Sequence, residues 1–133
     1  MNRIMVDTSA YSAVVRGHVR IKGILQEADH IWVSPVVLGE LHAGFRRGSR
    51  REENERILAS FLVSPRVAIA DIGEETAVRY AEILAFLRNA GTPVASNDIW
   101  IAAGAMQHGL RLVTTDADFR KIPQVVLDHH PAA

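Results

Sequence analysis

Short runs of apolar residues alternate with segments of helical periodicity along the whole chain. The apolar runs have the length typical of strands that are buried on both faces of a sheet. Strands that alternate with helices indicate βα units and a mostly parallel sheet with helices on both faces. The expected strands span residues 4–6, 31–33, 67–69, 110–114 and 125–127, and the expected helices span 10–16, 19–28, 36–45, 52–62, 74–89 and 98–108.

A chain of 133 residues can build one hydrophobic core without disulfides or other cross-links. The pattern contains no internal repeat, no low-complexity segment and no composition change that would mark a second domain. We therefore predict an α/β fold, a three-layer α/β/α sandwich, in a single domain that covers residues 1–133.

Residues 96–119 predict a helix followed by a buried strand and an acidic turn. The helix is expected to begin at Asp98, because this residue and the two before it are all favoured N-caps, and to end at Gly109. A helix of about 11 residues rises roughly 16 Å, and a strand of about five residues returns roughly 16 Å. We therefore expect Asp98 and Asp116 to be neighbours in space.

Four acidic residues are expected at one edge of the sheet. Asp7 and Asp116 each follow a strand, and Asp98 begins a helix that starts from the same edge. Glu40 lies in the helix that opens with Ser34-Pro35, roughly 7–8 Å below that edge. Helical side chains tilt toward the helix N-terminus, so this long side chain can reach back. The carboxyl ends of parallel strands are where such sheets bind ligands.

Four carboxylates that lie close together repel one another unless a cation balances their charge. The chain contains no cysteine, and carboxylate ligands select a hard cation such as Mg²⁺ or Mn²⁺. Such ions can activate water, hold a phosphodiester and stabilise the leaving oxygen. No Ser/His/Asp arrangement favours acyl transfer, so phosphodiester hydrolysis is the reaction that these residues indicate.

The charge distribution is uneven although the formal net charge is zero. Residues 1–51 carry eight Lys/Arg and four Asp/Glu (+4), and residues 52–133 carry seven and eleven (−4). Zero net charge excludes a globally basic nucleic-acid binder. The basic half includes a cluster around residues 46–51 that is a candidate contact for RNA or a protein partner: Arg46, Arg47, Arg50 and Arg51. It can equally be a solvated linker with local ion pairs.

The absence of cysteine suits a reducing compartment. No apolar run is long enough to span a membrane, and the first residues show no signal-peptide pattern. We expect a cytoplasmic protein that does not contact membranes. His129 and His130 are expected to lie in a polar tail rather than in a metal site.

Asp7 after the first strand, Glu40 after Ser34-Pro35, and the motifs of residues 98–103 and 114–119 resemble a PIN-domain ribonuclease. More narrowly, the chain resembles the VapC toxins of bacterial type II toxin–antitoxin systems. The resemblance covers nearly the whole chain, and residues 98–119 are its most specific part. It implies a metal-dependent endoribonuclease, generally a homodimer, which is silenced by a VapB-type antitoxin whose C-terminal segment covers the active-site groove.

The resemblance also assigns roles to individual residues. It implies that an acidic quartet holds Mg²⁺ or Mn²⁺ and carries catalysis: Asp7, Glu40, Asp98 and Asp116. Supporting roles are expected for Ser9 and Thr115, which carry hydroxyl groups, and for Asp118, a further acid. The position of Asp116 varies within the family, and so does the number of ions, one or two.

Each acid also has a simpler explanation. Asp7 and Asp98 can be N-caps, Glu40 can be a solvated helix residue, and Asp116 and Asp118 can be turn residues. Two other functions remain open at this point. One is a structure-specific DNA nuclease on the same scaffold. The other is a catalytically silent interaction module, for example receiver-like, although no acid adjoins the one after the first strand.

Overall fold

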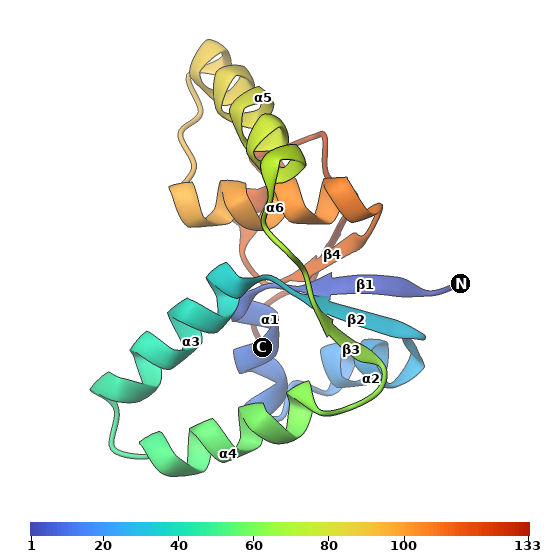
Figure 1. Ribbon diagram of the computed structural model, residues 1–133, viewed down its shortest axis with the longest axis vertical. Coiled ribbons are helices and arrows are strands. Elements are labelled where there is room, and N and C mark those ends of the chain that lie inside the picture. The colour runs from blue at the N-terminus through green and yellow to red at the C-terminus, as the bar shows by residue number, and fades with distance from the viewer.

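A five-stranded parallel sheet forms the centre of the computed structural model, which describes residues 1–133 (Figure 1). The strand order is β3-β2-β1-β4-β5, and all four neighbouring pairs are parallel. The expected α/β class and three-layer α/β/α arrangement are confirmed. The strands are β1 (Arg3–Val6), β2 (His30–Val33), β3 (Val67–Ile69), β4 (Arg111–Thr114) and β5 (Leu127–His129).

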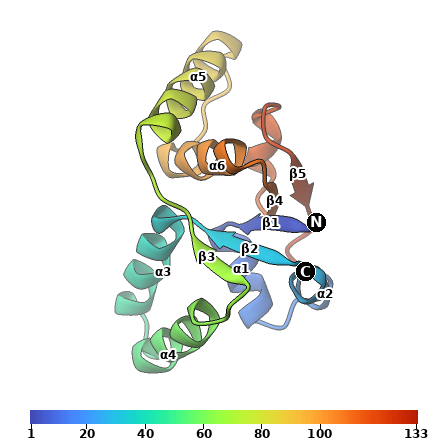
Figure 2. The ribbon, with the colours of Figure 1, turned by 45° about the vertical axis from the view of Figure 1, so that its right-hand side comes forward.

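Two groups of helices cover the two faces of the sheet. Helices α5 and α6 lie on one face, and α1 to α4 lie on the other, with α3 and α4 forming a projecting hairpin (Figures 1 and 2). None of the helices combines the length and apolarity that a membrane span needs. The helices are α1 (Thr8–Val15), α2 (Val19–Glu27), α3 (Pro35–Arg47), α4 (Arg51–Leu62), α5 (Glu74–Ala90), α6 (Ser96–His108) and the 3₁₀ helix η1 (Ala117–Lys121).

The central strands are buried because helices cover both of their faces. Ile4, Met5 and Val6 of β1 are 0% exposed, whereas Ile69 of the edge strand β3 is 48% exposed. The 28 buried hydrophobic residues form one cluster. This core fixes the positions of the strand ends, and hence of the residues that follow them.

Sequence-encoded caps determine where several helices begin and end. The Ser34 hydroxyl accepts a hydrogen bond from the Val36 N–H (3.1 Å), and Pro35 occupies the first position of α3. Gly91 and Gly109 end α5 and α6 with φ values of 69° and 64°, a left-handed conformation that favours glycine. The start of α3 after Ser34 and the end of α6 at Gly109 confirm the corresponding predictions.

The element boundaries lie within two residues of prediction, and two of the differences change where particular residues lie. Helix α6 begins at Ser96, two residues before Asp98, and its N-cap is Ala95, which offers no side-chain hydrogen bond. The last strand is shifted by two residues because the Val125 N–H bonds to the Ile122 carbonyl in the turn after η1. Consequently, His129 and His130 do not form a free tail: His129 lies in β5, and the His130 N–H bonds to the Thr114 carbonyl.

Candidate functional site

The crevice between the carboxyl ends of β1 and β4 is the topological switch point of the sheet. β1 and β4 are neighbours, but the connection from β1 leads to β2 on one side and the connection from β4 leads to β5 on the other. Right-handed crossovers therefore leave toward opposite faces and open a crevice where open α/β sheets bind ligands. Asp7 directly follows β1, and Asp116 follows β4 after one residue.

Asp7 is buried (3% exposed) and held by three donors. Its Oδ1 accepts from the Ala10 N–H (2.8 Å), its Oδ2 accepts from the Thr114 hydroxyl (2.6 Å), and the Ser9 hydroxyl lies 2.9 Å from both oxygens. Burial raises the pKa of Asp7, these hydrogen bonds oppose the rise, and the charge of Asp116 adds to it. Asp7 is thus both the N-cap of α1 and a fixed acid of the crevice.

A hydroxyl network ties the two strand ends together. The Ser9 hydroxyl is 3.2 Å from the Thr114 hydroxyl and accepts from the Thr115 N–H (3.0 Å). The Thr114 hydroxyl also accepts from the Asp116 N–H (2.9 Å). The hydroxyls that contact Asp7 therefore belong to Ser9 and Thr114. Thr115, whose hydroxyl was expected to support the site, donates its backbone N–H to Ser9.

Glu40 reaches the crevice from α3, as predicted from the length of its side chain and its tilt toward the helix N-terminus. Its Oε1 accepts from the Thr8 hydroxyl (2.5 Å), and its Oε2 accepts from the Asn97 side-chain amide (3.3 Å). Thr8 opens α1 and Asn97 lies in the first turn of α6. One carboxylate of α3 thereby links that helix to the starts of two others.

Asp98 carries the least compensated charge at the site. It lies in the first turn of α6, half-buried, and its carboxylate has no hydrogen-bond donor from the chain. Burial, followed by the negative charges of Asp116, Glu40, Asp7 and finally Asp118, raises its pKa from 3.8 to about 6. Every other acid proposed for the site therefore lies close enough to raise the pKa of Asp98.

The four acids line one cavity of about 540 Å³. Apart from Ala95, every lining residue is polar or charged, which distinguishes this cavity from an apolar ligand pocket. The lining residues are Asp7, Thr8, Ser9, Ser12, Glu40, Ala95, Ser96, Asn97, Asp98 and Asp116.

Asp118 lies outside this cavity. Its backbone N–H donates to Asp116 Oδ1 (2.9 Å), while its side chain is 53% exposed and pairs with Lys121 (3.2 Å). The basic cluster also lies outside the cavity, at the α3–α4 turn, and all four of its arginines are exposed. Arg50 and Arg51 form ion pairs with glutamates of α4.

The donor set of the cavity fits a hard divalent cation. All of its acidic and hydroxyl ligands are oxygen atoms, and no histidine lines the cavity. No cationic side chain of the protein pairs with Asp98, and burial together with the neighbouring acids raises its pKa. No three of the acids stand at ligand spacing around a common point in the present side-chain arrangement.

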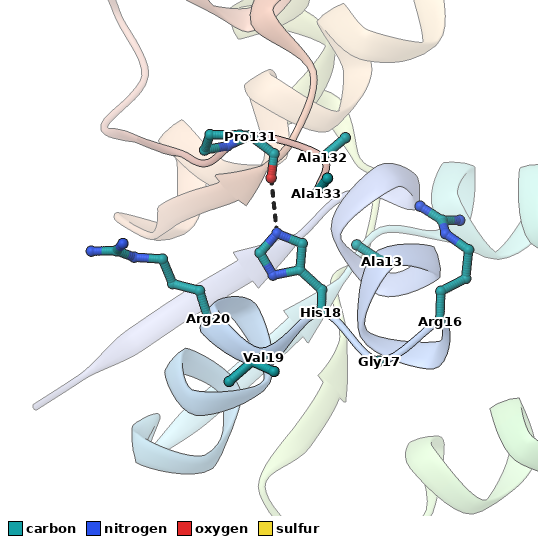
Figure 3. Close-up of a pocket in the computed structure, with 9 residues that line it drawn as sticks. All are labelled: Ala13, Arg16, Gly17, His18, Val19, Arg20, Pro131, Ala132 and Ala133. Atoms are coloured by element: carbon teal, nitrogen blue, oxygen red, sulfur yellow. Dashed lines mark hydrogen bonds between the residues drawn. The ribbon is translucent and has the colours of Figure 1, made fainter.

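A different cavity, of about 580 Å³, lies between the α1–α2 turn and the carboxyl-terminal residues (Figure 3). His18 holds it together: Nδ1 accepts from the Ile21 N–H (3.2 Å), so the Nε2–H donates to the Pro131 carbonyl (2.8 Å). No acidic side chain lines this cavity. It anchors the end of the chain and lacks the chemistry of the first cavity.

Sequence reasoning missed Thr8, Asn97 and Thr114, the residues that orient Glu40 and Asp7. Two of them had a positional signal, because Thr8 follows a strand by one residue and Thr114 ends a strand at the same sheet edge. Asn97 had the same signal as Asp98, since both lie at the start of α6.

Comparison with known proteins identifies the family. The PIN domain family matches residues 4–125. The chain is 36% identical to Ribonuclease VapC4 of Mycobacterium tuberculosis over 99 residues, which is 74% of this chain and 76% of that protein. It is 30% identical to Ribonuclease VapC2 of Rickettsia felis over 107 residues, 80% of this chain and 78% of that protein.

A solved structure agrees with these matches. The chain superposes with a TM-score of 0.81 and 26% identity on a chain of VapBC2 from Rickettsia felis, crystallised bound to a DNA fragment from its promoter. The match covers 95% of this chain and 97% of that one. The chain therefore belongs to the PIN domain family, in its VapC group.

Proposed function

We propose that this protein is a metal-dependent endoribonuclease and the toxin of a toxin–antitoxin pair. The observation that carries the proposal is the convergence of four carboxylates on one polar cavity. Burial, and then the charges of the neighbouring acids, raise the pKa of Asp98 to about 6, which agrees with a site that lacks its cation. A Mg²⁺ or Mn²⁺ ion would be held by Asp7, Glu40, Asp98 and Asp116, directly or through water. When bound, such an ion supplies charge neutralisation and water activation for phosphodiester hydrolysis.

The chain's own residues would hold these acids in place. Thr114, Ser9 and the Ala10 N–H fix both oxygens of Asp7, so its orientation is set before any ligand arrives. Thr8 and Asn97 do the same for Glu40. Ligand acids that are oriented by such hydrogen bonds lose little conformational freedom on binding, which favours both affinity and activity.

RNA is the proposed substrate because the curated relatives named above are ribonucleases of the VapC group. The proposed partner is a VapB-type antitoxin, since the structural relative is a VapBC2 protein. By resemblance, we propose that this antitoxin covers the active-site groove and that the chain forms a homodimer. An acidic cavity that is open to solvent is consistent with control by a covering partner.

The test is cleavage of single-stranded RNA with Mg²⁺ or Mn²⁺ by the parent chain and three Asp→Asn variants. We expect Asp7→Asn and Asp98→Asn to retain the fold and to lose about 100-fold or more of the cleavage rate. Asp71→Asn is the matched control, because Asp71 also lies beyond the end of a strand but does not line the cavity. It should cleave at the parent rate.

Two results would remove the assignment: full activity of the Asp98→Asn protein at saturating Mn²⁺, or no metal uptake by the parent. Flap-structured DNA assayed in parallel separates an RNA enzyme from a DNA enzyme. Preferential cleavage of the flap DNA would replace the ribonuclease proposal.

A further inference from the structure

One face of α3 runs from the acidic cavity toward the α3–α4 turn. Glu40, Gly44 and Arg47 are spaced i, i+4 and i+7, so they lie within roughly 60° of one another around the helix axis. Arg46, the preceding residue, points roughly 100° away from Arg47. Only one of the two adjacent arginines therefore shares the face of the cavity acid.

The guanidinium group of Arg47 lies back along this face. Its Nη2 is 3.9 Å from the position that a Cβ atom would occupy at Gly44. Arginine side chains in a helix tilt toward its N-terminus, and the missing side chain at Gly44 leaves their path open. The guanidinium consequently sits near the level of Gly44, about 6 Å along the axis from the Cα atom of Glu40.

The positive charge of Arg47 has no partner within the chain. Arg50 and Arg51 pair with Glu53 (4.0 Å) and Glu55 (3.3 Å), whereas no carboxylate lies within 4.0 Å of Arg47. Arg47 is exposed. It is therefore a free cation on the outward path from the cavity.

An RNA strand that enters the cavity meets an electrostatic obstacle. The four acids that would attract a cation repel the phosphates on either side of the bond to be cleaved. A cation just outside the cavity offsets this repulsion and sets the strand's register. Arginine suits this role because its planar guanidinium can donate two parallel hydrogen bonds to one phosphate.

We propose that Arg47, lying over Gly44, binds an RNA phosphate that flanks the scissile one and so positions the strand across the cavity. This inference rests on the proposed function, since it takes single-stranded RNA as the substrate. It assigns the basic cluster unequal roles: Arg47 contacts the substrate, and Arg46 does not.

The test measures binding of a short fluorescein-labelled single-stranded RNA by anisotropy between about 50 and 200 mM KCl. All proteins carry Asp98→Asn and the buffer contains EDTA, so the RNA stays intact. Arg47→Gln should weaken binding roughly 3- to 5-fold and reduce the slope of log affinity against log salt by about 0.7. Arg46→Gln, which removes the same charge, should leave affinity and slope at the reference values.

A third variant tests whether the Arg47 side chain must lie over Gly44, without changing the charge of the protein. Gly44→Leu keeps the net charge but fills the space along which the Arg47 side chain lies, so it should weaken binding as Arg47→Gln does. Circular dichroism confirms that each variant is folded.

Equal slopes for the Arg47→Gln and Arg46→Gln proteins would overturn the inference, as would undetectable RNA binding at the lowest salt. Unchanged RNA binding in all variants would overturn it as well, because neither Arg47 nor its path over Gly44 would then contribute to RNA binding. RNA cleavage by the otherwise unsubstituted parent is measured separately. A parent that binds RNA through Arg47 but does not cleave it would refute the proposed function and leave this inference standing.

Discussion

Replacing Asp98 with asparagine should stabilise the metal-free protein at neutral pH. The folded-state pKa of Asp98 is raised from 3.8 to about 6, so ionisation of this carboxylate costs the folded state free energy. The rise corresponds to about 3 kcal/mol. Because Asp98 is only half-buried, solvent screening reduces this to roughly 1.5 kcal/mol.

One favourable term opposes the gain. Asp98 lies in the first turn of α6, where a negative charge interacts with the helix dipole by about 0.5 kcal/mol. The carboxylate accepts no hydrogen bond from the chain, so asparagine loses none. The net expectation is a stabilisation of about 1 kcal/mol, or roughly 3–5 °C in Tm for a chain of this size.

The dependence on pH shows whether ionisation of Asp98 causes the difference in stability. Below the unfolded-state pKa, Asp98 is protonated in both states and its charge costs nothing. The cost grows as the pH rises from 3.8 toward about 6 and is complete above that value. The advantage of the Asp98→Asn protein should therefore be full near pH 7.5 and almost absent near pH 4.

Urea unfolding in EDTA at these two pH values measures the effect, with Asp71→Asn as the control for loss of an exposed carboxylate. Added Mg²⁺ should stabilise the parent more than the Asp98→Asn protein, by up to about 2.7 kcal/mol at a hundredfold excess over Kd. If asparagine confers no gain near neutral pH, or a gain that persists in acid, the argument that burial and neighbouring charges penalise ionised Asp98 is wrong.

Two further substitutions test the supports of the site. Thr114→Val removes the buried hydroxyl that contacts both Asp7 and the Asp116 N–H, and should cost about 2–3 kcal/mol of unfolding free energy by urea titration. Thr115→Val should change stability by less than about 0.5 kcal/mol; equal costs would refute the distinction. Gly23→Ala, where a Cβ atom meets nothing within 4 Å inside α2, should raise stability by about 0.5–1 kcal/mol, and a lower Tm would contradict this.

Local rules were enough to predict the elements and the gathering of the acids. The buried strands β1 and β4 were predicted from their apolar runs. The lengths of α6 and β4 predicted that the chain returns to the edge of the sheet where α6 begins, and Asp98 and Asp116 do line one cavity there. The same reasoning placed Glu40 correctly, because a tilted and long side chain needs only helix geometry.

The remaining features depend on contacts between distant parts of the chain. The bond from Thr114 to Asp7 joins residues 107 positions apart, and only the register between β1 and β4 selects Thr114 rather than Thr115. The start of α6 at Ser96 was missed because residues 96–98 are all favoured N-cap types, so the sequence indicated no unique N-cap. In the structure the N-cap is Ala95. The position of Arg47 depends on an open space at Gly44, which no propensity scale describes.

Anomalous diffraction from a crystal soaked in Mn²⁺ tests most directly whether the acidic cavity is a cation site. The account predicts an anomalous peak inside the cavity, within coordination distance of oxygens from Asp7 and Asp98, and its loss in the Asp98→Asn protein. A fully soaked crystal with no peak there, or with manganese bound only elsewhere on the surface, would contradict it.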